Sequence, residues 1–350
     1  MNLFRLLLLP FSLIYGIITF IRNKFFDWGI FKSTAFKIPI ISVGNLEVGG
    51  SGKTPLVAYI INLLKDNNQI ATLSRGYGRK TKGFLWVKAD GLASNTGDEP
   101  LQIKQSFPDV KVAVCENRVF GIEQIQAKAD LILMDDAFQH RAVKPGFSIL
   151  LFDYNQLQKP KFLLPAGNYR EFFGGRKRAD ILVVSKCTAD LSVEKKREII
   201  SALKPYPNQQ VFFSYIKYQS TLKSVFGDDD FEVTNLKSKK NVLVLTGIAK
   251  PKILINKVKQ HVEVIRHHSY PDHHQFTQKN MLKLANDFKM LATEDKIIIT
   301  TQKDAVRLRS ELFKKILSGL PIFEWPIETD FFETDKLEFD KIILKYAQGN

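Results

Sequence analysis

Cysteine is nearly absent from this chain, which has only Cys115 and Cys187 in 350 residues. Two cysteines cannot form the disulfide framework of a small secreted domain, and these two lack the C-x-x-C spacing of a metal site. The sequence also has no internal repeat at a solenoid period and no low-complexity segment. These absences exclude a disulfide-stapled, repetitive or disordered protein. They indicate an ordered globular protein of a reducing compartment.

Acidic residues are the minority charge: 36 Asp and Glu stand against 51 Lys and Arg, and the formal net charge is +15 at pH 7. Such an excess favours anionic partners, which include nucleotides, nucleic acids and acidic membrane surfaces. The basic residues are spread along the chain, with local clusters at 75–82, 170–178 and 237–240. No nucleic-acid recognition module is visible, so we expect no nucleic-acid partner.

Charge is missing altogether between Arg5 and Arg22, where the run LLLLPFSLIYGIITFI stands. This run is shorter than the ~20 residues of a comfortable bilayer span, and Pro10 and Gly16 weaken a straight helix. Interleaved basic and aromatic residues follow in place of a cleavage site, which suits a membrane interface with anionic head groups. We therefore expect residues 1–25 to form a membrane-associated helix. A helix buried against the body of the protein is the alternative.

Short apolar runs alternate with helical patterns through the first half of the chain. The runs are nearly all apolar, as strands covered on both faces are, and they lie at 38–43, 70–74, 110–114, 131–134, 148–152 and 181–185. This pattern predicts an α/β fold, a P-loop NTPase-type open sheet with helices on both faces. Ligands of such sheets bind at the carboxyl ends of the strands.

The sequence pattern changes after residue 205. QVFFSYIKY and LKSVFG resemble a paired ribbon, and the segments that follow suggest a second, smaller α/β lobe, with a nucleotide cleft between the lobes. We therefore predict four parts: an N-terminal helix over 1–25, a P-loop domain over 26–205, a linker ribbon over 206–240 and a smaller C-terminal lobe over 241–350.

The segment EVGGSGKTP resembles a phosphate-binding loop that lacks one glycine. The usual pattern, G-x-x-x-x-G-K-[ST], requires glycine where Glu47 stands. The spacing G-G-x-G-K-T matches the variant loop of dinitrogenase reductase and cell-division ATPases, although Val48 replaces their extra lysine. A strand precedes the loop and a helix follows it, which is the context that phosphate binding requires. We predict that nucleotide is bound by Gly49, Gly50, Ser51, Gly52, Lys53, Thr54 and Pro55.

A second element supports a metal–nucleotide site. In such a loop Lys53 neutralises β/γ-phosphate oxygens and Thr54 ligates Mg²⁺. The apolar strand LILM runs into Asp135 and Asp136, as the second acidic motif of such enzymes does. Adjacent acids at a strand end also serve as turn residues or helix caps. With the loop upstream, metal coordination by a carboxylate of this pair is the better interpretation.

Two further polar clusters lie in expected loops. In NTGDEP, Asp98 and Glu99 either divide proton acceptance and metal binding or begin a helix, and their spacing leaves both open. HHSYPDHHQF holds four of the six histidines, and there His273 could pair with a carboxylate across a cleft. A zinc site, for which His-His pairs without cysteine are a weak pattern, and exposed loop histidines are the alternatives.

Seven segments, taken in order, resemble the tetraacyldisaccharide 4'-kinases, the lipid A kinases of Gram-negative bacteria: SVGNLEVGGSGKTP, SRGYGR, TGDEP, DDAFQHR, LPAGNYRE, YPDHHQF and TTQKDAVRL. The similarity covers nearly the whole chain, and the joint pattern is specific although each piece is not. It implies phosphoryl transfer from ATP, with Mg²⁺, to the 4'-hydroxyl of a tetraacyldisaccharide 1-phosphate. The place implied is the cytoplasmic face of the bacterial inner membrane, with the chain held peripherally or by its N-terminal helix on the anionic surface.

The resemblance also implies roles by position. Asp98 would be the general base, assisted by His273, and Lys53 would act on the phosphates. The metal and its waters would be held by Thr54, Glu99, Asp136 and Gln139. Asp135 and His140 are weaker candidates nearby. The lipid A disaccharide precursor would meet Asn45, Arg75, Tyr77, Arg118, His140, Arg170 and Glu171.

A membrane-associated P-loop ATPase that acts as a switch without a lipid acceptor is the alternative function. GTP is disfavoured, because SKCT lacks the Asp of a guanine-reading N/T-K-x-D motif and TQKD has its Lys displaced. The excess positive charge and the apolar N-terminus both fit an acylated, phosphorylated acceptor. We therefore predict the kinase.

Overall fold

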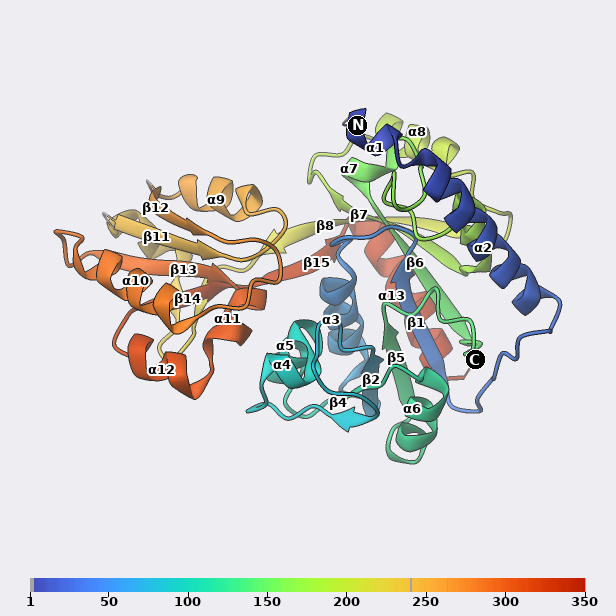
Figure 1. Ribbon diagram of the computed structural model, residues 1–350, viewed down its shortest axis with the longest axis horizontal. Coiled ribbons are helices and arrows are strands. Elements are labelled where there is room, and N and C mark those ends of the chain that lie inside the picture. Colours follow the sequence, from blue (N-terminus) through green and yellow to red (C-terminus); the bar gives the residue numbers. More distant parts are fainter. Residues whose placement is uncertain (1–2, 240, 263, 350) are drawn as a thin grey trace.

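Two sheets organise the computed structural model, which describes residues 3–239, 241–262 and 264–349 (Figure 1). The larger sheet has nine strands in the order β15-β8-β7-β6-β1-β5-β2-β4-β3, and the smaller has six in the order β10-β9-β14-β13-β11-β12. Figure 1 shows the sheets in two lobes, with β8 and β15 running between them. The predicted α/β architecture with a second, smaller lobe is confirmed.

The larger sheet is parallel except at its edges. Its strands are β1 (Ile40–Asn45), β2 (Ile70–Ser74), β3 (Leu85–Trp86), β4 (Lys111–Val114), β5 (Leu131–Asp135), β6 (Phe147–Asp153), β7 (Ile181–Cys187), β8 (Gln210–Tyr218) and β15 (Ile327–Phe331). Strand β1 lies between β5 and β6 and is parallel to both, whereas β3 and β15 pair antiparallel. All six strands predicted from apolar runs belong to this sheet. The loop after β1 therefore emerges at the centre of the sheet, at the carboxyl ends where ligands bind.

Alternation of side chains along the strands gives the sheet two apolar faces. Ile41 and Val43 of β1 pack on one face with helices α3, α5 and α13, while Ile40 packs on the other, which α6 and α8 cover. The helices of this lobe are α1 (Leu3–Leu6), α2 (Leu9–Asp27), α3 (Lys53–Leu64), α4 (Ala93–Thr96), α5 (Asp98–Ser106), α6 (Arg118–Ile125), α7 (Tyr154–Leu157), α8 (Val193–Leu203) and α13 (Glu333–Ala347), with the 3-10 turns η1 (Gln126–Lys128) and η2 (Phe173–Arg178).

The smaller lobe repeats the same layering around its own sheet. Its strands are β9 (Thr221–Ser224), β10 (Phe231–Glu232), β11 (Asn241–Thr246), β12 (Val264–Ser269), β13 (Lys296–Thr301) and β14 (Ile322–Trp325). Its helices are α9 (Lys252–Lys259), α10 (Gln278–Lys289), α11 (Gln302–Leu308) and α12 (Glu311–Leu317), with the 3-10 turn η3 (Val233–Ser238). Strands β12, β11, β13 and β14 are parallel neighbours, and β9 adds antiparallel to β14.

The boundaries expected at 206–240 and 241–350 differ from this arrangement. Strand β8 is a member of the larger sheet, parallel to β7, and β9 and β10 belong to the smaller one. The chain then returns: β15 pairs with β8, and α13 buries Phe339 and Ile343 in the core of the larger lobe. An antiparallel edge strand and a terminal helix have no signal in sequence that tells which lobe they join. That the four predicted parts of the chain, 1–25, 26–205, 206–240 and 241–350, are separate folding units remains a prediction.

Phe339→Ala tests the return of α13. Phe339 is fully buried and its ring stacks on Phe331 with centroids 4.4 Å apart, so its loss leaves a cavity in the larger lobe. We expect the free energy of unfolding to fall by about 3–5 kcal/mol, measured by denaturant titration. Leu337→Ala, on the same helix but 72% exposed, is the matched control and should have little effect. Equal effects of the two would contradict the assignment.

Candidate active site

The loop between β1 and α3 has the backbone that a phosphate-binding loop requires. Gly49 and Gly52 have φ angles of 104° and 88°, a region that other residues rarely adopt, and Gly52 caps the N-terminus of α3. Glu47 does not break the loop, because the positive angles fall on Gly49 and Gly52. Helix α3 thus points its N-terminus, and the positive end of its dipole, at the loop.

The ammonium of Lys53, the first residue of α3, contacts side chains at the carboxyl ends of two adjacent strands. Lys53 is 9% exposed and its ammonium donates to Asn45 Oδ1 at 3.1 Å. The same ammonium lies 3.4 Å from Asp136 Oδ1. Asn45 ends β1 and Asp136 follows β5, so adjacent parallel strands bring the two side chains to one edge. The structure therefore brings Asn45 and Lys53, from one predicted segment, together with Asp136 from another.

Asp136 is already neutralised by side chains of the protein. Arg170 Nη1 donates to both carboxylate oxygens of Asp136, at 2.8 and 3.0 Å. The backbone of Asp136 has a φ of 51°. Burial opposes ionisation, but Lys53 and Arg170 lower the pKa of Asp136 below its ordinary value. Gln139 is engaged too: it donates to Asn45 O at 2.9 Å and accepts from Arg170 at 3.3 Å. Two of the predicted metal ligands are thus occupied by protein contacts.

Asp135 differs from its neighbour. It is buried, and within the described part of the chain its Oδ1 has no hydrogen-bond partner. Burial, with the negative charge of Glu99, raises the pKa of Asp135 to about 7, although Lys53 acts against this. Residues 3–239, 241–262 and 264–349 contain no group of three or more His, Cys, Asp or Glu side chains arranged to hold a metal. An orphaned buried carboxyl beside a second acid nevertheless fits a cation.

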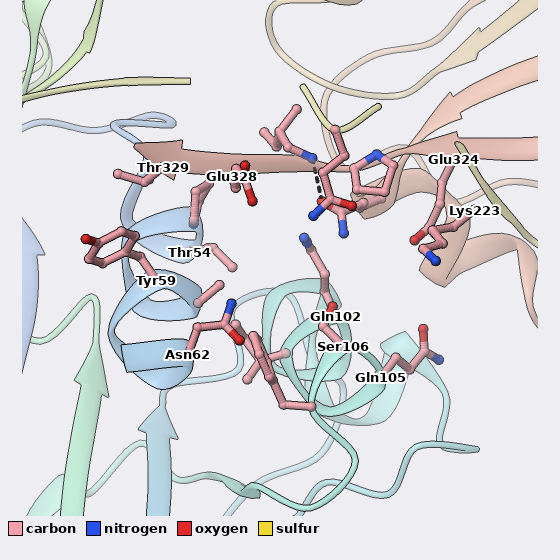
Figure 2. Close-up of a pocket in the computed structure, with 18 of the residues that line it drawn as sticks. Thr54, Tyr59, Asn62, Gln102, Gln105, Ser106, Lys223, Glu324, Glu328 and Thr329 are labelled. Carbon is pink, nitrogen blue, oxygen red and sulfur yellow. Dashed lines mark hydrogen bonds between the residues drawn. The ribbon is translucent and has the colours of Figure 1, made fainter. Parts of the chain in front are cut away.

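A cavity of about 870 Å³ lies between the lobes and reaches Thr54. Figure 2 shows Thr54, Tyr59 and Asn62 of α3 on one side of it. The other lining residues that Figure 2 labels come from α5, β15 and the smaller lobe: Gln102, Gln105, Ser106, Glu328, Thr329, Lys223 and Glu324. The cavity follows α3 from the phosphate-binding loop into the cleft between the lobes.

Asp98 joins the two lobes. It begins α5 in the larger lobe, and its Oδ2 accepts from Arg307 Nη2 at 2.5 Å and from His273 Nδ1 at 3.1 Å, both in the smaller lobe. Burial disfavours the carboxylate, but the hydrogen bonds from His273 and Arg307 outweigh it and lower the pKa of Asp98 to about 2. Among the described residues side chains bond only Oδ2, which leaves Oδ1 to accept a proton.

His273 is fixed from its other side as well. Lys303 Nζ donates to His273 Nε2 at 3.0 Å, so the ring proton lies on Nδ1 and points at Asp98. The ring of Tyr77 lies edge-on to that of His273, with centroids 5.3 Å apart. His274 instead stacks on Tyr270 and contacts Asn280. Of the two histidines, His273 is the one that faces the cleft.

Sequence reasoning missed Arg307 and left Lys303 without a role. Both lie on α11, four residues apart, so they share a helix face that packs on α5. Arg307 is 7% exposed and is also held by Asp304, at 3.0 Å. The Lys-x-x-x-Arg spacing in TTQKDAVRL was the available signal. It could show that the two cations share a face, and only the fold shows that the face meets Asp98.

A group of cationic side chains lies beside the acidic pair. Arg118 is buried, and burial together with nearby Arg75 lowers its pKa to about 10. Burial and the charges of Arg118, Arg22 and Arg75 lower the pKa of His140 to about 4, so His140 is neutral at pH 7. The negative charges of Asp136 and Asp135 oppose this lowering of the pKa of Arg118. The predicted residues Arg75, Arg118 and His140 therefore lie in one electropositive region.

The predicted residues Arg170 and Glu171 connect helix α2 to the site through hydrogen bonds. Glu171 is buried and accepts two hydrogen bonds from Arg178, both at 2.8 Å, and one from Asn23 at 3.0 Å. Tyr15 of α2 donates to Arg170 O at 2.8 Å. One face of α2 is thus fastened to the segment that carries Arg170 and Glu171.

The opposite face of α2 is apolar and exposed. Leu7, just before α2, is 71% exposed, and Phe11, Ile14 and Ile18 are 61%, 55% and 60% exposed; they recur at helical spacing. Such a continuous apolar stripe is rare on a protein surface that meets only water. Of the helices in the described ranges, none has the length and hydropathy needed to cross a bilayer.

Comparisons with known proteins agree along the whole chain. The family model for tetraacyldisaccharide-1-P 4'-kinase matches residues 4–348. The tetraacyldisaccharide 4'-kinase of Flavobacterium johnsoniae is 44% identical over 354 residues, which cover 100% of this chain and 99% of the relative. That of Bacteroides thetaiotaomicron is 39% identical over 360 residues, covering 98% and 93%. The crystal structure of LpxK from Aquifex aeolicus in complex with ATP matches with a TM-score of 0.76 at 29% identity, covering 99% of this chain and 100% of that one.

Proposed function

The chain belongs to the tetraacyldisaccharide 4'-kinase family, and from this premise we infer what its site does. It uses ATP to phosphorylate the 4'-hydroxyl of a tetraacyldisaccharide 1-phosphate, a step of lipid A biosynthesis. The observation that carries this is the match over 4–348, which includes both lobes and every polar cluster described above. A switch ATPase without an acceptor does not account for that match.

The function is tested with ATP labelled in its γ-phosphate and the tetraacyldisaccharide 1-phosphate in detergent micelles. We expect the label to migrate with the lipid on thin-layer chromatography. Label released only as inorganic phosphate would support the switch ATPase instead.

Phosphate binding falls to the loop and Lys53. Loop backbone N–H groups and the α3 N-terminus would surround the phosphates, and Lys53 would neutralise their oxygens. Lys53 is positioned before ATP arrives, because Asn45 and Asp136 hold its ammonium at 3.1 and 3.4 Å. Preorganised charge of this kind stabilises the transition state of phosphoryl transfer without reorganisation during the reaction.

Mg²⁺ would be held at the edge where β1 and β5 end. The carboxyl of Asp135, whose Oδ1 has no partner in the described part of the chain, would supply oxygen ligands of the kind this ion prefers, together with Glu99 and Thr54. Asp136 and Gln139, also expected as ligands, are positioned by Arg170 and would act through ordered water or change partner on binding. The ion would supply charge neutralisation of the phosphates.

Asp98 is proposed as the general base. Phosphoryl transfer depends on positioning and charge more than on covalent catalysis, so one base that orients the acceptor hydroxyl suffices. Its Oδ1 would accept the hydroxyl proton, while His273 and Arg307 keep the carboxylate ionised and fixed through Oδ2. Because these two residues come from the smaller lobe, the base is complete only when the lobes meet.

Arg307→Met tests this arrangement through pH. The guanidinium lowers the pKa of Asp98, so its removal should raise that pKa, and the acid limb of kcat/KM should move to higher pH. Arg309→Met is the matched control, because Arg309 contacts Gln105 and Glu324 instead. Loss of a buried ion-pair partner will also lower the melting temperature, so rates are measured below it. An unchanged acid limb in Arg307→Met would contradict the role of Asp98.

The acceptor would lie between the electropositive region and α2. Arg75 and Arg118 fit an anionic phosphate on the lipid, and neutral His140 offers a hydrogen bond without competing for charge. Asn45, Arg170 and Glu171 would line the acceptor site on the side of Asp136 and α2, and Tyr77 would line it beside His273. The exposed stripe of α2 would face the acyl chains at an anionic membrane surface on the cytoplasmic side.

Paired substitutions Ile14→Glu and Ile18→Glu test the membrane surface. Carboxylates on the exposed stripe should oppose insertion among acyl chains and anionic head groups. We expect strongly reduced sedimentation with phosphatidylglycerol vesicles and an unchanged melting temperature, because both positions are more than half exposed. Leu337→Glu, at an exposed site on α13, should sediment as the unsubstituted protein does. Undiminished sedimentation of the paired variant would assign membrane binding to another surface.

A further inference from the structure

The end of β7 contacts the phosphate-binding loop directly. Ser185 Oγ donates to Ser51 O at 2.6 Å, and the ammonium of the next residue, Lys186, donates to Gly50 O. The strand order β7-β6-β1 means that these contacts pass over the end of β6. Two successive loop carbonyls are therefore held by a strand that is not a neighbour of β1.

Lys186 has a backbone that a lysine rarely adopts. Its φ is 59°, in the left-handed region, and the pairing of β7 with β8 shifts register between Val184 and Cys187. A bulge at a strand end re-aims a side chain, and strain of this kind concentrates at ligand-binding sites. Here the re-aimed side chain reaches the loop.

The surrounding charges leave an excess of positive charge. Asp153, at the end of β6, is 3% exposed and lies 3.4 Å from Lys186 Nζ and 3.3 Å from Lys250 Nζ. The two ammonium groups thus share the Asp153 carboxylate, and Lys250 comes from the smaller lobe. Glu47 is a further acid of this cluster, but burial and the charge of Asp153 raise its pKa, which weakens its contribution of negative charge. Burial lowers the pKa of Lys186, and the negative charge of Asp153 opposes this effect without cancelling it. The positive charge of the Lys186 ammonium is therefore only partly balanced by the protein. An anion beside the loop would balance the rest.

The phosphate-binding loop also carries a hydroxyl group that lacks a hydrogen-bond partner among the described residues. This group is the buried Ser51 Oγ. Ser51 is also the residue whose carbonyl Ser185 holds. The free hydroxyl of Ser51 and the ammonium of Lys186, which reaches the carbonyl of the adjacent Gly50, are both donors that a phosphate oxygen can accept from.

We propose that Lys186 is a second phosphate-binding lysine, which binds the β/γ-phosphates of ATP across the loop from Lys53. It would take the place of the extra lysine that variant loops carry where Val48 stands. Asp153 orients Lys186, and Lys250 makes the smaller lobe part of the same cluster. This inference rests on the proposed ATP-dependent function.

The test is isothermal titration of the full chain with ATP, ADP and AMP in the presence of Mg²⁺. Lys186→Met should weaken binding of ATP and ADP by about 10–100-fold, the range for one lost charge-assisted hydrogen bond, and leave AMP binding unchanged. Lys186→Arg should retain most of the ATP affinity. Lys204→Met is the matched control: Lys204 also has a positive φ, of 47°, but is exposed at the end of α8, and its loss should change nothing.

ATP affinity that is unchanged in Lys186→Met would overturn the inference, as would a loss shared equally by ATP and AMP, which would indicate support of the loop alone. Lys53→Met separates the two claims. If it loses ATP affinity and Lys186→Met does not, only the inference fails. If the unsubstituted chain does not bind ATP, the proposed function fails with it.

Discussion

Asp98→Asn is expected to lower kcat for lipid phosphorylation by about 10²–10⁴-fold, the usual contribution of a general base. The amide keeps the shape of the side chain but cannot take the proton of the acceptor hydroxyl. Asp98 is not in contact with the loop, so the affinity for ATP should hardly change. The measurement is kcat by lipid phosphorylation together with Kd for ATP by titration. A collapse of ATP affinity would instead make Asp98 a ligand of the metal or the nucleotide.

Asp98→Asn is also expected to lower the free energy of unfolding, and this effect must be separated from the effect on kcat. The pKa of Asp98 is lowered from 3.8 to about 2, so its ion pairs stabilise the fold above pH 3.8 and are lost as the pH falls towards 2. At neutral pH the amide forfeits on the order of 2 kcal/mol. Rates are therefore compared at temperatures where both proteins are folded.

Lys53→Met is expected to reduce kcat/KM for ATP by about 10²–10³-fold, the range for removal of one preorganised charge from a transition state. Methionine preserves the aliphatic stem but leaves the phosphates and Asp136 without this ammonium. Arg170 still neutralises Asp136, so the fold should persist. Steady-state kinetics with varied ATP give the value, and circular dichroism checks the fold.

Lys65→Met is the control for Lys53. Lys65 follows α3 at its other end and its side chain lies over the ring of Phe107, remote from the loop. Its loss should leave kcat/KM within the error of the unsubstituted protein. A small effect of Lys53→Met would mean that the loop binds phosphate through its backbone and Lys186 alone.

Local patterns in sequence predicted the parts that local physics decides. The apolar runs became the strands of the larger sheet because strands buried on both faces have no polar side. The loop over 47–55 was readable because glycine spacing reports where the backbone must be left-handed. Asp98 and His273 were both named, and the structure places them 3.1 Å apart although 175 residues separate them in sequence.

What sequence could not supply is the meeting of segments from different lobes. Arg307 touches Asp98 only because α11 packs on α5, and Lys186 reaches Gly50 only because a bulge re-aims it over β6. Whether Asp136 faces a metal or Arg170 likewise depends on where the segment after β6 returns to the sheet. β15 and α13 return to the larger lobe for tertiary reasons that no local pattern contains.

The ratio of lipid phosphate formed to ATP consumed tests the central claim most directly. It is measured in one reaction that contains labelled ATP and the tetraacyldisaccharide 1-phosphate in micelles. The account predicts one phosphorylated lipid for each ATP consumed, and an Asp98→Asn variant that slows both in parallel. ATP consumption that proceeds at the same rate without lipid product, in either protein, would contradict it.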